Sequence, residues 1–316
     1  MPTKYLFAAS TGGHLAQLHR LAEHLDGSED SLWVTFRSPQ SESLLHDRRV
    51  MYIPYIRPRD ARGVARGMAS IGRLLRQERF DRVMSTGAGI ALAVFPLTRL
   101  RRIPNDYVES VSRVQGPSLT GRIVAASSLA STWTQHASWA SKRWKLRSSV
   151  LAGFRSVPKQ APPADRAPLR VFCTLGTIEG YRFDSLIDRL IDVSGPGAHL
   201  VWQLGYSARD GLPGTTHSLM SNAAFEDAAL TADVVVTHSG VGTILKLLDL
   251  GIRPVVVPRR SARNEHVDDH QEQIAALVER EGLAVVRESD ELKQDDLRLA
   301  SRLAVEPLIG RHDDAR

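Results

Sequence analysis

The feature that constrains the fold most is a unit that recurs in both halves of the chain: a short apolar run, a glycine turn and the start of a helical pattern. It is present at 4–18, 82–97 and 234–250, and 169–177 shows its strand and turn. Short apolar runs that alternate with helical patterns are typical of parallel sheets in α/β proteins. The sequence therefore predicts two Rossmann-like, doubly wound parallel-sheet lobes, which 316 residues are enough to build.

The other elements follow the same pattern. In the first half we expect strands at Lys4–Ala9, Ser31–Phe36, Val50–Ile56, Arg82–Ser85 and Asp106–Glu109. The clearest helix is Ala61–Gln77, in which an apolar stripe is formed by Val64, Met68, Ile71 and Leu75. In the second half we expect strands at Leu169–Leu175, His199–Leu204, Val234–Thr237, Pro254–Val257 and Leu283–Val286. Helices are expected at Asp184–Val193, Thr243–Leu250 and Asp269–Glu279, followed by a helical tail.

A proline-rich stretch separates the two halves. Residues 156–168 contain four prolines and no apolar period, which is typical of a linker. The predicted lobes are therefore residues 1–155 and 169–316. Two such lobes place a ligand cleft between them, at the carboxyl ends of the strands.

Composition narrows the classes of function. A single cysteine, Cys173, excludes a disulfide framework and a cysteine-based zinc site. No stretch approaches the roughly 20 apolar residues of a spanning helix, and the first residues are too short an apolar run for a signal peptide. These features predict a cytoplasmic protein that is soluble or peripheral to a membrane.

Charge is divided unevenly along the chain. Residues 1–160 carry 24 Lys and Arg against 11 Asp and Glu, whereas residues 161–316 carry 17 against 24. A basic lobe favours an anionic partner such as a phosphate, a nucleic acid or an acidic membrane surface. The arginine-rich stretches lack interleaved aromatic residues and a recognition-helix motif, so no nucleic acid is expected.

The first glycine turn of the first lobe places a histidine at a helix start. Gly12 and Gly13 allow close approach of a ligand to the backbone, and the helix amino terminus attracts an anion. The turn is not the GxGxxG fingerprint of dinucleotide enzymes. His14 is either a general base at the mouth of the cleft or an exposed histidine beside a turn.

Two further positions of the first lobe carry candidate chemistry. Gly87, in the turn at 85–89, either flanks the same acceptor pocket or lets a helix pack closely on the sheet. Glu109 ends a predicted strand, with Arg113 four residues later. The carboxylate suits a sugar hydroxyl and the guanidinium suits a phosphate, and a surface ion pair is the alternative.

The second lobe contains two glycine turns. Gly176 and Thr177 close its first strand, and the segment 237–243 combines His238, Ser239, Gly240, Gly242 and Thr243 at a helix start. Backbone N–H groups and hydroxyls at such a position can bind a diphosphate. Since the segment lacks the lysine of a P-loop, hydrolysis of a nucleoside triphosphate is not expected.

A dense polar stretch follows the apolar run PVVVP. It begins at Arg259 and continues through Glu265, His266, Asp269, His270 and Gln271. Many hydrogen-bonding groups at one strand end suit a polyhydroxylated sugar. His266 and His270 are four residues apart, but they lack the HExxH pattern, so hydrogen bonding is favoured and no metal is predicted.

These motifs together resemble a known family. The stretches THSGVGTILKLLDLGIRPVVVPRR and NEHVDDHQ are similar to the carboxyl lobe of family 28 glycosyltransferases. STGGHLAQL, STGAGIALA and YVESVSRVQGPSLTGR are similar to the membrane-recruiting subunit of the dolichol-pathway enzyme and to the first member of two-gene exopolysaccharide transferases. The chain resembles a fusion of the two subunits, over about residues 4–286.

The resemblance implies the GT-B fold and inverting transfer of a hexose from a UDP-sugar, with no cofactor and no metal. It implies a polyprenyl-diphosphate-linked saccharide acceptor at the inner face of the cell membrane, in exopolysaccharide or cell-envelope synthesis. It also implies contact with an anionic membrane surface and with other proteins of a polysaccharide assembly machinery. In this reading residues 1–155 bind the acceptor and residues 169–316 bind the donor.

Site roles follow from the matched motifs. The donor residues implied are Gly176, Thr177, Gln203, His238, Ser239, Gly240, Gly242, Thr243, Arg259, Glu265, Asp269, His270 and Gln271, with Leu204 and Gly205 near the uracil. The acceptor residues implied are Gly12, Gly13, Gly87 and Arg113. His14 is the preferred base, and Glu109 is its rival.

One position departs from the family pattern. Many relatives carry a glutamate that binds ribose in the helix after HSGxGT, and this chain has Lys246 there. This departure favours one alternative function, a catalytically idle partner that recruits another transferase to the membrane. A UDP-sugar epimerase also stays open, because it shares this architecture. The arginines around Ala61–Gln77 can face anionic lipid, whereas the apolar stripe of that helix is expected in the core.

Overall fold

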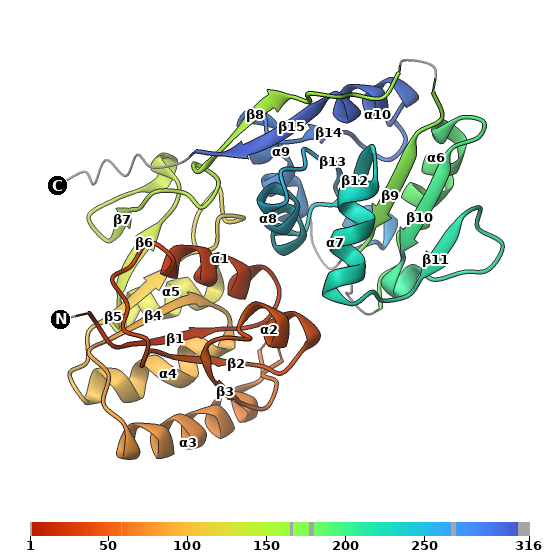
Figure 1. Cartoon of the computed structure of the whole chain (residues 1–316). Helices are drawn as coiled ribbons and strands as arrows, with labels where there is room; N and C mark the ends of the chain where they lie inside the picture. Colours follow the sequence, from red (N-terminus) through yellow and green to blue (C-terminus); the bar gives the residue numbers. More distant parts are fainter. Residues whose placement is uncertain (1, 58, 165–166, 177–179, 267–269, 309–316) are drawn as a thin grey trace. The chain divides into compact units, whose positions relative to one another are not determined.

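The computed structural model describes residues 2–57, 59–164, 167–176, 180–266 and 270–308 (Figure 1). It divides into two compact units, Met1–Val150 (unit 1) and Leu151–Arg316 (unit 2). Each is an α/β unit built on a parallel sheet, and each is described by itself.

Unit 1 contains a seven-stranded parallel sheet of order β3-β2-β1-β4-β5-β6-β7. Its strands are β1 (Tyr5–Ala9), β2 (Leu32–Thr35), β3 (Arg49–Tyr52), β4 (Arg82–Gly87), β5 (Asn105–Val108), β6 (Ser131–Thr134) and β7 (Trp144–Leu146). Its helices are α1 (Gly13–Ala22), α2 (Pro39–Leu44), α3 (Ala61–Gln77), α4 (Gly89–Leu100), α5 (Leu119–Ala126) and the short η1 (Ala137–Trp139).

The core of unit 1 explains why its strands are apolar throughout. β1 is buried along its whole length because helices cover both faces of the sheet, with α1 on one face and α3 and α4 on the other (Figure 1). On α3, Ile71 and Leu75 are buried, and Val64 and Met68 pack against the same core. Gly67 also faces it, since an added Cβ would lie 3.0 Å from that of Ala93 on α4. The apolar stripe of α3 is therefore core, as expected.

Unit 2 contains a six-stranded parallel sheet of order β11-β10-β9-β12-β13-β14. Its strands are β9 (Arg170–Thr174), β10 (His199–Gln203), β11 (Thr215–His217), β12 (Val234–His238), β13 (Val255–Val257) and β14 (Val285–Val286). Its helices are α6 (Asp184–Ser194), α7 (Asn222–Thr231), α8 (Val241–Asp249), α9 (His270–Arg280), α10 (Gln294–Ser301) and the short η2 (Gly205–Ser207) and η3 (Ser261–Arg263).

The two faces of this sheet hold separate apolar clusters. Side chains alternate along β9, so Val171 and Cys173 join the cluster that contains α6 and α10, while Phe172 joins the one that contains α7 and α8. Both faces of the central strands are covered, which accounts for the valine runs of β12 and β13.

The predicted linker at 156–168 is wrong at its start. Residues 156–158 belong to β8 (Phe154–Pro158), which pairs antiparallel with β15 (Leu303–Pro307) near the other end of unit 2. The prolines concealed this strand, because its partner lies about 150 residues away. The predicted helical tail is likewise the single helix α10 followed by strand β15.

Candidate functional site

In unit 2 the strand order reverses between β9 and β12, the two central strands. The chain leaves β9 toward β10 and β11, and it leaves β12 toward β13 and β14. In doubly wound sheets such a reversal opens a crevice at the carboxyl ends of the strands, where ligands bind. The segments that follow the two strands are Leu175–Gly176 and Ser239–Gly240, so the predicted glycine turns lie side by side at this edge.

His238 fills the space between these two turns. A Cβ added to Gly176 would lie 2.5 Å from His238 Cε1, and one added to Gly240 would lie 2.3 Å from His238 Nε2. Gly176 also has φ +73°, which side chains rarely adopt. Burial and then the charge of Arg259 lower the pKa of His238 to about 3. His238 is therefore a neutral ring that shapes both turns.

Two hydroxyl groups at this edge lack a hydrogen-bond partner. Ser239 Oγ and Thr174 Oγ1 are buried and have none among the residues that the structure describes. Next to Ser239, α8 starts without a side-chain cap and without an acidic residue in its first turn. The first N–H groups of a helix have no partner within it and attract anions. This edge can therefore bind an anion.

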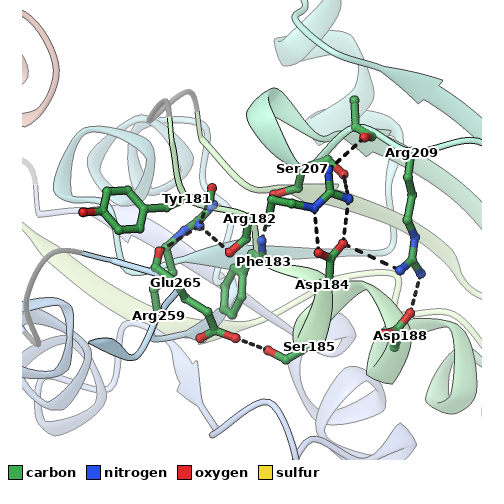
Figure 2. Close-up of polar contacts among 11 residues, drawn as sticks. Tyr181, Arg182, Phe183, Asp184, Ser185, Asp188, Ser207, Arg209, Arg259 and Glu265 are labelled. Atoms are coloured by element: carbon green, nitrogen blue, oxygen red, sulfur yellow. Dashed lines mark hydrogen bonds and ion pairs between the residues drawn. The ribbon is translucent and has the colours of Figure 1, made fainter. Parts of the chain in front are cut away.

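Arg259 is a fully buried arginine two residues after β13. Its NH1 donates to the carbonyl oxygens of Tyr181, Arg182 and Glu265 at 3.1–3.3 Å (Figure 2). Its NH2 donates to the carbonyl oxygen of Leu175 at 2.9 Å. The guanidinium also lies 4.7 Å from the centroid of the Phe183 ring. Burial lowers the pKa of Arg259 to about 10, so the group is still charged at neutral pH. The guanidinium thus binds the protein's own backbone.

The segment after β13 is held by two further buried side chains. Glu265 accepts from Ser185 Oγ with one carboxylate oxygen (Figure 2) and from Arg260 N at 3.0 Å with the other. Gln271 Oε1 accepts from Arg259 N at 3.2 Å. Both residues were predicted to contact the donor, and the structure shows them fixing the loop that would do so.

The other predicted donor residues are distributed as follows. Gln203 is buried at the end of β10, and Gly242 and Thr243 lie partly buried in the first turn of α8. Thr177 and Asp269 lie outside the described residues. His270 is the first residue of α9, and its side chain is also outside the described part.

Lys246 on α8 is directed toward α7. Its Nζ contacts Asn222 Oδ1, lies 3.6 Å from Glu226 Oε1 and lies 4.2 Å from the centroid of the Phe225 ring. Partial burial lowers the pKa of Lys246. The lysine therefore fastens α8 to α7.

His14, the second residue of α1, occupies the corresponding edge of unit 1 and is partly buried. Its Nδ1 lies 2.8 Å from the carbonyl oxygen of Thr86, and Thr86 Oγ1 donates to the His14 carbonyl at 2.7 Å. A carbonyl only accepts, so Nδ1 carries the proton and Nε2 keeps its lone pair. Burial lowers the pKa of His14, and the Thr86 bond and the charge of Glu109 act in the opposite direction. The ring is neutral at neutral pH, with Nε2 as its basic atom.

Glu109 is enclosed and fully hydrogen-bonded. Its Oε1 accepts from Ser110 N at 3.0 Å and from the Tyr107 hydroxyl at 3.3 Å. Its Oε2 accepts from the backbone N and the hydroxyl of Ser118, the N-cap of α5, at 2.9 and 3.0 Å. A Cβ on Gly121 would lie 2.3 Å from this oxygen. The carboxylate ties β5 to α5 and has little room for a substrate.

The predicted acceptor residues gather around His14 with one exception. Gly13 precedes it, and Gly87 leaves room for it, since an added Cβ would lie 3.3 Å from His14 Cε1 and 2.9 Å from the Tyr107 hydroxyl. The charge of Arg113 lowers the pKa of His14, so it too is near the ring. Gly12 instead faces α2, where its N–H donates to Gln40 Oε1 at 2.6 Å.

A buried amide that the sequence analysis missed holds this site together. Gln17 donates to Gly13 O and Ser110 Oγ, both at 3.0 Å, and its Oε1 accepts from Val111 N at 2.8 Å and from Gln135 Nε2 at 3.2 Å. It thereby joins α1 to the segment after β5. The available signal was a polar residue on the otherwise apolar face of α1.

None of the described helices combines the length and the apolar character needed to cross a membrane. Within the described residues, no group of three or more His, Cys, Asp and Glu side chains is arranged to hold a metal ion.

Comparison with known proteins identifies part of unit 2. Residues 215–302 match the glycosyltransferase family 28 C-terminal domain. The match contains the glycine turn after β12, the start of α8 and the segment after β13, which together form most of the site described above. Unit 2 therefore carries a family 28 domain, as the resemblance implied.

Solved structures show the fold of the whole chain. MurG of Acinetobacter baumannii is 19% identical with a TM-score of 0.56, and the alignment covers 94% of this chain and 89% of that one. SnogD, a glycosyltransferase from Streptomyces nogalater, is 18% identical with a TM-score of 0.52, covering 95% and 92%. A UDP-GlcNAc 2-epimerase from Neisseria meningitidis, bound to UDP-GlcNAc, is 12% identical with a TM-score of 0.52, covering 94% and 97%. The chain has the GT-B fold, and its family 28 domain marks it as a glycosyltransferase.

Proposed function

We propose that this glycosyltransferase transfers a sugar from a UDP-sugar donor to a polyprenyl-diphosphate-linked saccharide, with inversion of configuration at C1 of the sugar. The reaction belongs to exopolysaccharide or cell-envelope synthesis. Unit 2 binds the donor and unit 1 binds the acceptor. The chemical step needs no metal and no cofactor, and it takes place at the cytoplasmic face of the cell membrane.

One observation carries the donor assignment: the buried Ser239 hydroxyl has no partner among the described residues, and it adjoins the uncapped start of α8 inside a family 28 domain. A buried hydroxyl without a partner costs free energy that a bound ligand can recover. The diphosphate of UDP supplies acceptor oxygens for the hydroxyl and negative charge for the helix start. The same contacts stabilise UDP as it leaves.

His14 is the base in this proposal. Its Nε2 takes the proton of the acceptor hydroxyl while the hydroxyl oxygen attacks C1 of the donor sugar. The bond between C1 and the diphosphate oxygen breaks, the electron pair leaves with UDP, and a single displacement inverts C1. The Thr86 carbonyl holds the ring in the tautomer that this step needs.

Glu109 acts as a positioning residue rather than as a rival base. Four hydrogen bonds from protein donors occupy its oxygens, so it has no free lone pair directed at an acceptor. Its negative charge instead favours the imidazolium that forms on His14 during proton transfer.

Exposed arginines of unit 1 support contact with an anionic membrane. They lie along α3 and at the end of the adjacent α4, at Arg62, Arg66, Arg73, Arg76, Arg99, Arg101 and Arg102. Among the described residues, Arg66 is the one of these with a nearby carboxylate, that of Asp60 at 3.9 Å. Basic residues at such a surface are worth about 1 kcal/mol each against anionic lipid.

A transfer assay tests the proposed function. The chain is incubated with each of a panel of UDP-sugars, with and without lipid-linked saccharides extracted from bacterial membranes, and released UDP and labelled lipid are measured. We expect both products only when donor and lipid acceptor are present, and no loss with EDTA. Absence of transfer with every donor would overturn the proposal.

The same assay separates the two alternatives. Epimerase structures share this fold, and an epimerase would release an altered sugar without any acceptor. An idle recruiting partner would bind no UDP-sugar. This alternative is favoured by Lys246, which replaces the glutamate of many relatives and contacts Asn222 on α7. The family 28 domain favours transfer over both.

A further inference from the structure

Two arginines flank β13 at equal distances from its ends and make the same kind of contact. Arg253, before the strand, donates from Nε to Gly282 O at 2.8 Å and from NH2 to Ala284 O at 3.2 Å. Arg259, after the strand, donates to four backbone carbonyls. The two differ in position, because Arg259 lies at the carboxyl edge of the sheet, where the candidate donor site is.

The four carbonyls that Arg259 gathers belong to three separate segments. Leu175 is the first residue after β9, Tyr181 and Arg182 precede α6, and Glu265 lies in the segment after β13. Among the residues that the structure describes, no backbone hydrogen bond joins these segments to one another. The guanidinium is therefore the shared link between two of the loops that form the donor site.

Arg182 extends this link to a third loop. Its carbonyl accepts from Arg259, while its side chain donates to Asp184 at 2.7 and 2.9 Å and to Ala208 O at 3.3 Å (Figure 2). Phe183 N also donates to Ser207 Oγ at 2.9 Å. The loop after β10, which was predicted to lie near the uracil, is thus fastened to the residues that Arg259 holds.

We propose that Arg259 is a positioning residue of the donor site: it sets the relative placement of the loops after β9 and β13, and through Arg182 that of the loop after β10, without touching the donor. The inference rests on the proposed binding of a UDP-sugar by unit 2. It replaces the direct donor contact that the sequence predicted for Arg259, because NH1 and NH2 already donate to the protein and Nε, which has no partner among the described residues, is buried.

The chemistry of the guanidinium explains why arginine occupies this position. Its planar fork directs donors to several carbonyls at once, and it remains charged when buried. A lysine ammonium is a point donor with three N–H groups and cannot reach four carbonyls spread around a plane. Arg259→Lys keeps the charge, loses the fork and lets the loops shift.

Paired variants test the inference by calorimetric titration with UDP. Arg253→Lys is the matched control, because it removes the same kind of contact from the other end of β13. We expect both variants to lower the melting temperature. Arg259→Lys should weaken UDP affinity on the order of tenfold or more, since small misplacements at a site are that costly, and Arg253→Lys should leave it unchanged.

Recovery of UDP affinity by added guanidinium distinguishes a positioning role from general destabilisation. Arg259→Ala leaves a cavity of guanidinium shape, and millimolar guanidinium, far below denaturing concentrations, should restore part of the lost UDP affinity. The same addition to Arg253→Ala should leave UDP affinity as it was. If Arg259→Ala does not fold, the lysine pair alone decides the question.

The outcomes separate this inference from the proposed function. Wild-type chain that binds no UDP contradicts the proposed function itself. Wild-type chain that binds UDP, together with Arg259→Lys that binds it equally well or loses affinity only as much as Arg253→Lys, overturns the positioning role alone.

Discussion

Each unit has a histidine beside a glycine turn at the carboxyl edge of its sheet, His14 and His238, and the two are built for different tasks. His14 in unit 1 is partly buried, with one ring nitrogen fixed by the Thr86 carbonyl and the other left basic. His238 in unit 2 is buried between Gly176 and Gly240, and its pKa is lowered to about 3. The same side chain at the same kind of turn is thus suited to proton transfer in one unit and to shaping a turn in the other.

The units also differ in how completely their buried polar atoms are paired. Among the described residues, buried side-chain atoms without a partner number one in unit 1, Thr35 Oγ1, and four in unit 2, on Thr174, Ser239, Arg253 and Arg259. Three of the four lie at the candidate donor site. The described part of unit 1 thus has almost all of its buried hydrogen bonds in place, whereas in unit 2 we propose that the donor diphosphate pairs the Ser239 hydroxyl.

Removing the basic atom of unit 1 has the largest expected effect. His14→Ala should lower turnover by roughly 10²–10⁴-fold, the range for loss of a general base. The affinity for UDP, measured by calorimetry, should stay unchanged because the donor binds to unit 2.

His19→Ala is the control for that experiment. His19 lies on the same helix near Trp33 and Glu23, away from the site, so turnover should persist. Retained turnover in His14→Ala would remove the functional distinction between the two histidines.

Crowding the ring of His238 is the second way to test the comparison. Gly176→Ala introduces a Cβ 2.5 Å from His238 Cε1 at φ +73°, so both turns must move. We expect UDP affinity to fall by about tenfold or more. Gly211→Ala provides the control, since Gly211 has φ +76° and nothing within 4 Å of an added Cβ.

The control variant carries the same backbone strain, of about 1 kcal/mol, without the steric conflict. It should therefore lower the melting temperature and leave UDP affinity intact. Equal losses of affinity in the two glycine variants would show that the ring of His238 does not shape the site.

Protonation of His238 should make the stability of the fold depend on pH. The folded-state pKa of His238 is about 3, below the ordinary 6.5, so the unfolded chain binds the extra proton first. Its contribution is full above about pH 6.5 and falls as pH decreases toward 3, by up to about 1.4 kcal/mol per pH unit. Denaturant unfolding across this range should show a shallower pH dependence in His238→Gln. An unchanged slope would contradict the burial of a neutral ring.

Activity should respond to acid through the other histidine. Because burial lowers the pKa of His14, the base stays unprotonated at neutral pH, and turnover should fall only as pH drops below 6.5. An acidic limb of the pH profile of turnover that is centred above pH 6.5 would argue against His14 as the base.

The smallest expected effect concerns the charge difference between the units. Arg76→Glu, in the last turn of α3, should weaken binding to vesicles containing anionic phospholipid by about 1 kcal/mol or somewhat more. Arg280→Glu, in the last turn of α9 in unit 2, makes the same charge change and should have little effect. Equal losses in a vesicle sedimentation assay would mean that net charge, not the α3 surface, governs binding.

Local patterns were sufficient to predict five strands of each sheet and several helices, but β6, β7 and β11 were missed. The bounds of α3 agree at Ala61–Gln77, because its period and its ends are encoded within the segment. The glycine turns were found because a glycine after an apolar run is a local signal. β8 was taken for linker, because its partner β15 is distant in sequence.

The hydrogen-bonding roles of the site residues could not be read from the sequence. Arg259 reaches Leu175, which is 84 residues away, and His14 reaches Thr86, 72 residues away. Glutamate is a residue type that can act as a base. In the folded chain, however, Tyr107, Ser110 and Ser118 donate hydrogen bonds to the Glu109 carboxylate and enclose it. Composition and spacing therefore located the site, and packing decided which groups remain available.

Calorimetric titration of the full chain with UDP and with uridine, with and without EDTA, tests the central claim most directly. If the start of α8 and Ser239 bind a diphosphate, UDP should bind far more tightly than uridine, EDTA should change nothing, and Ser239→Ala should weaken UDP alone. UDP that binds no better than uridine, or no binding of either, would contradict the account of unit 2 as the donor site.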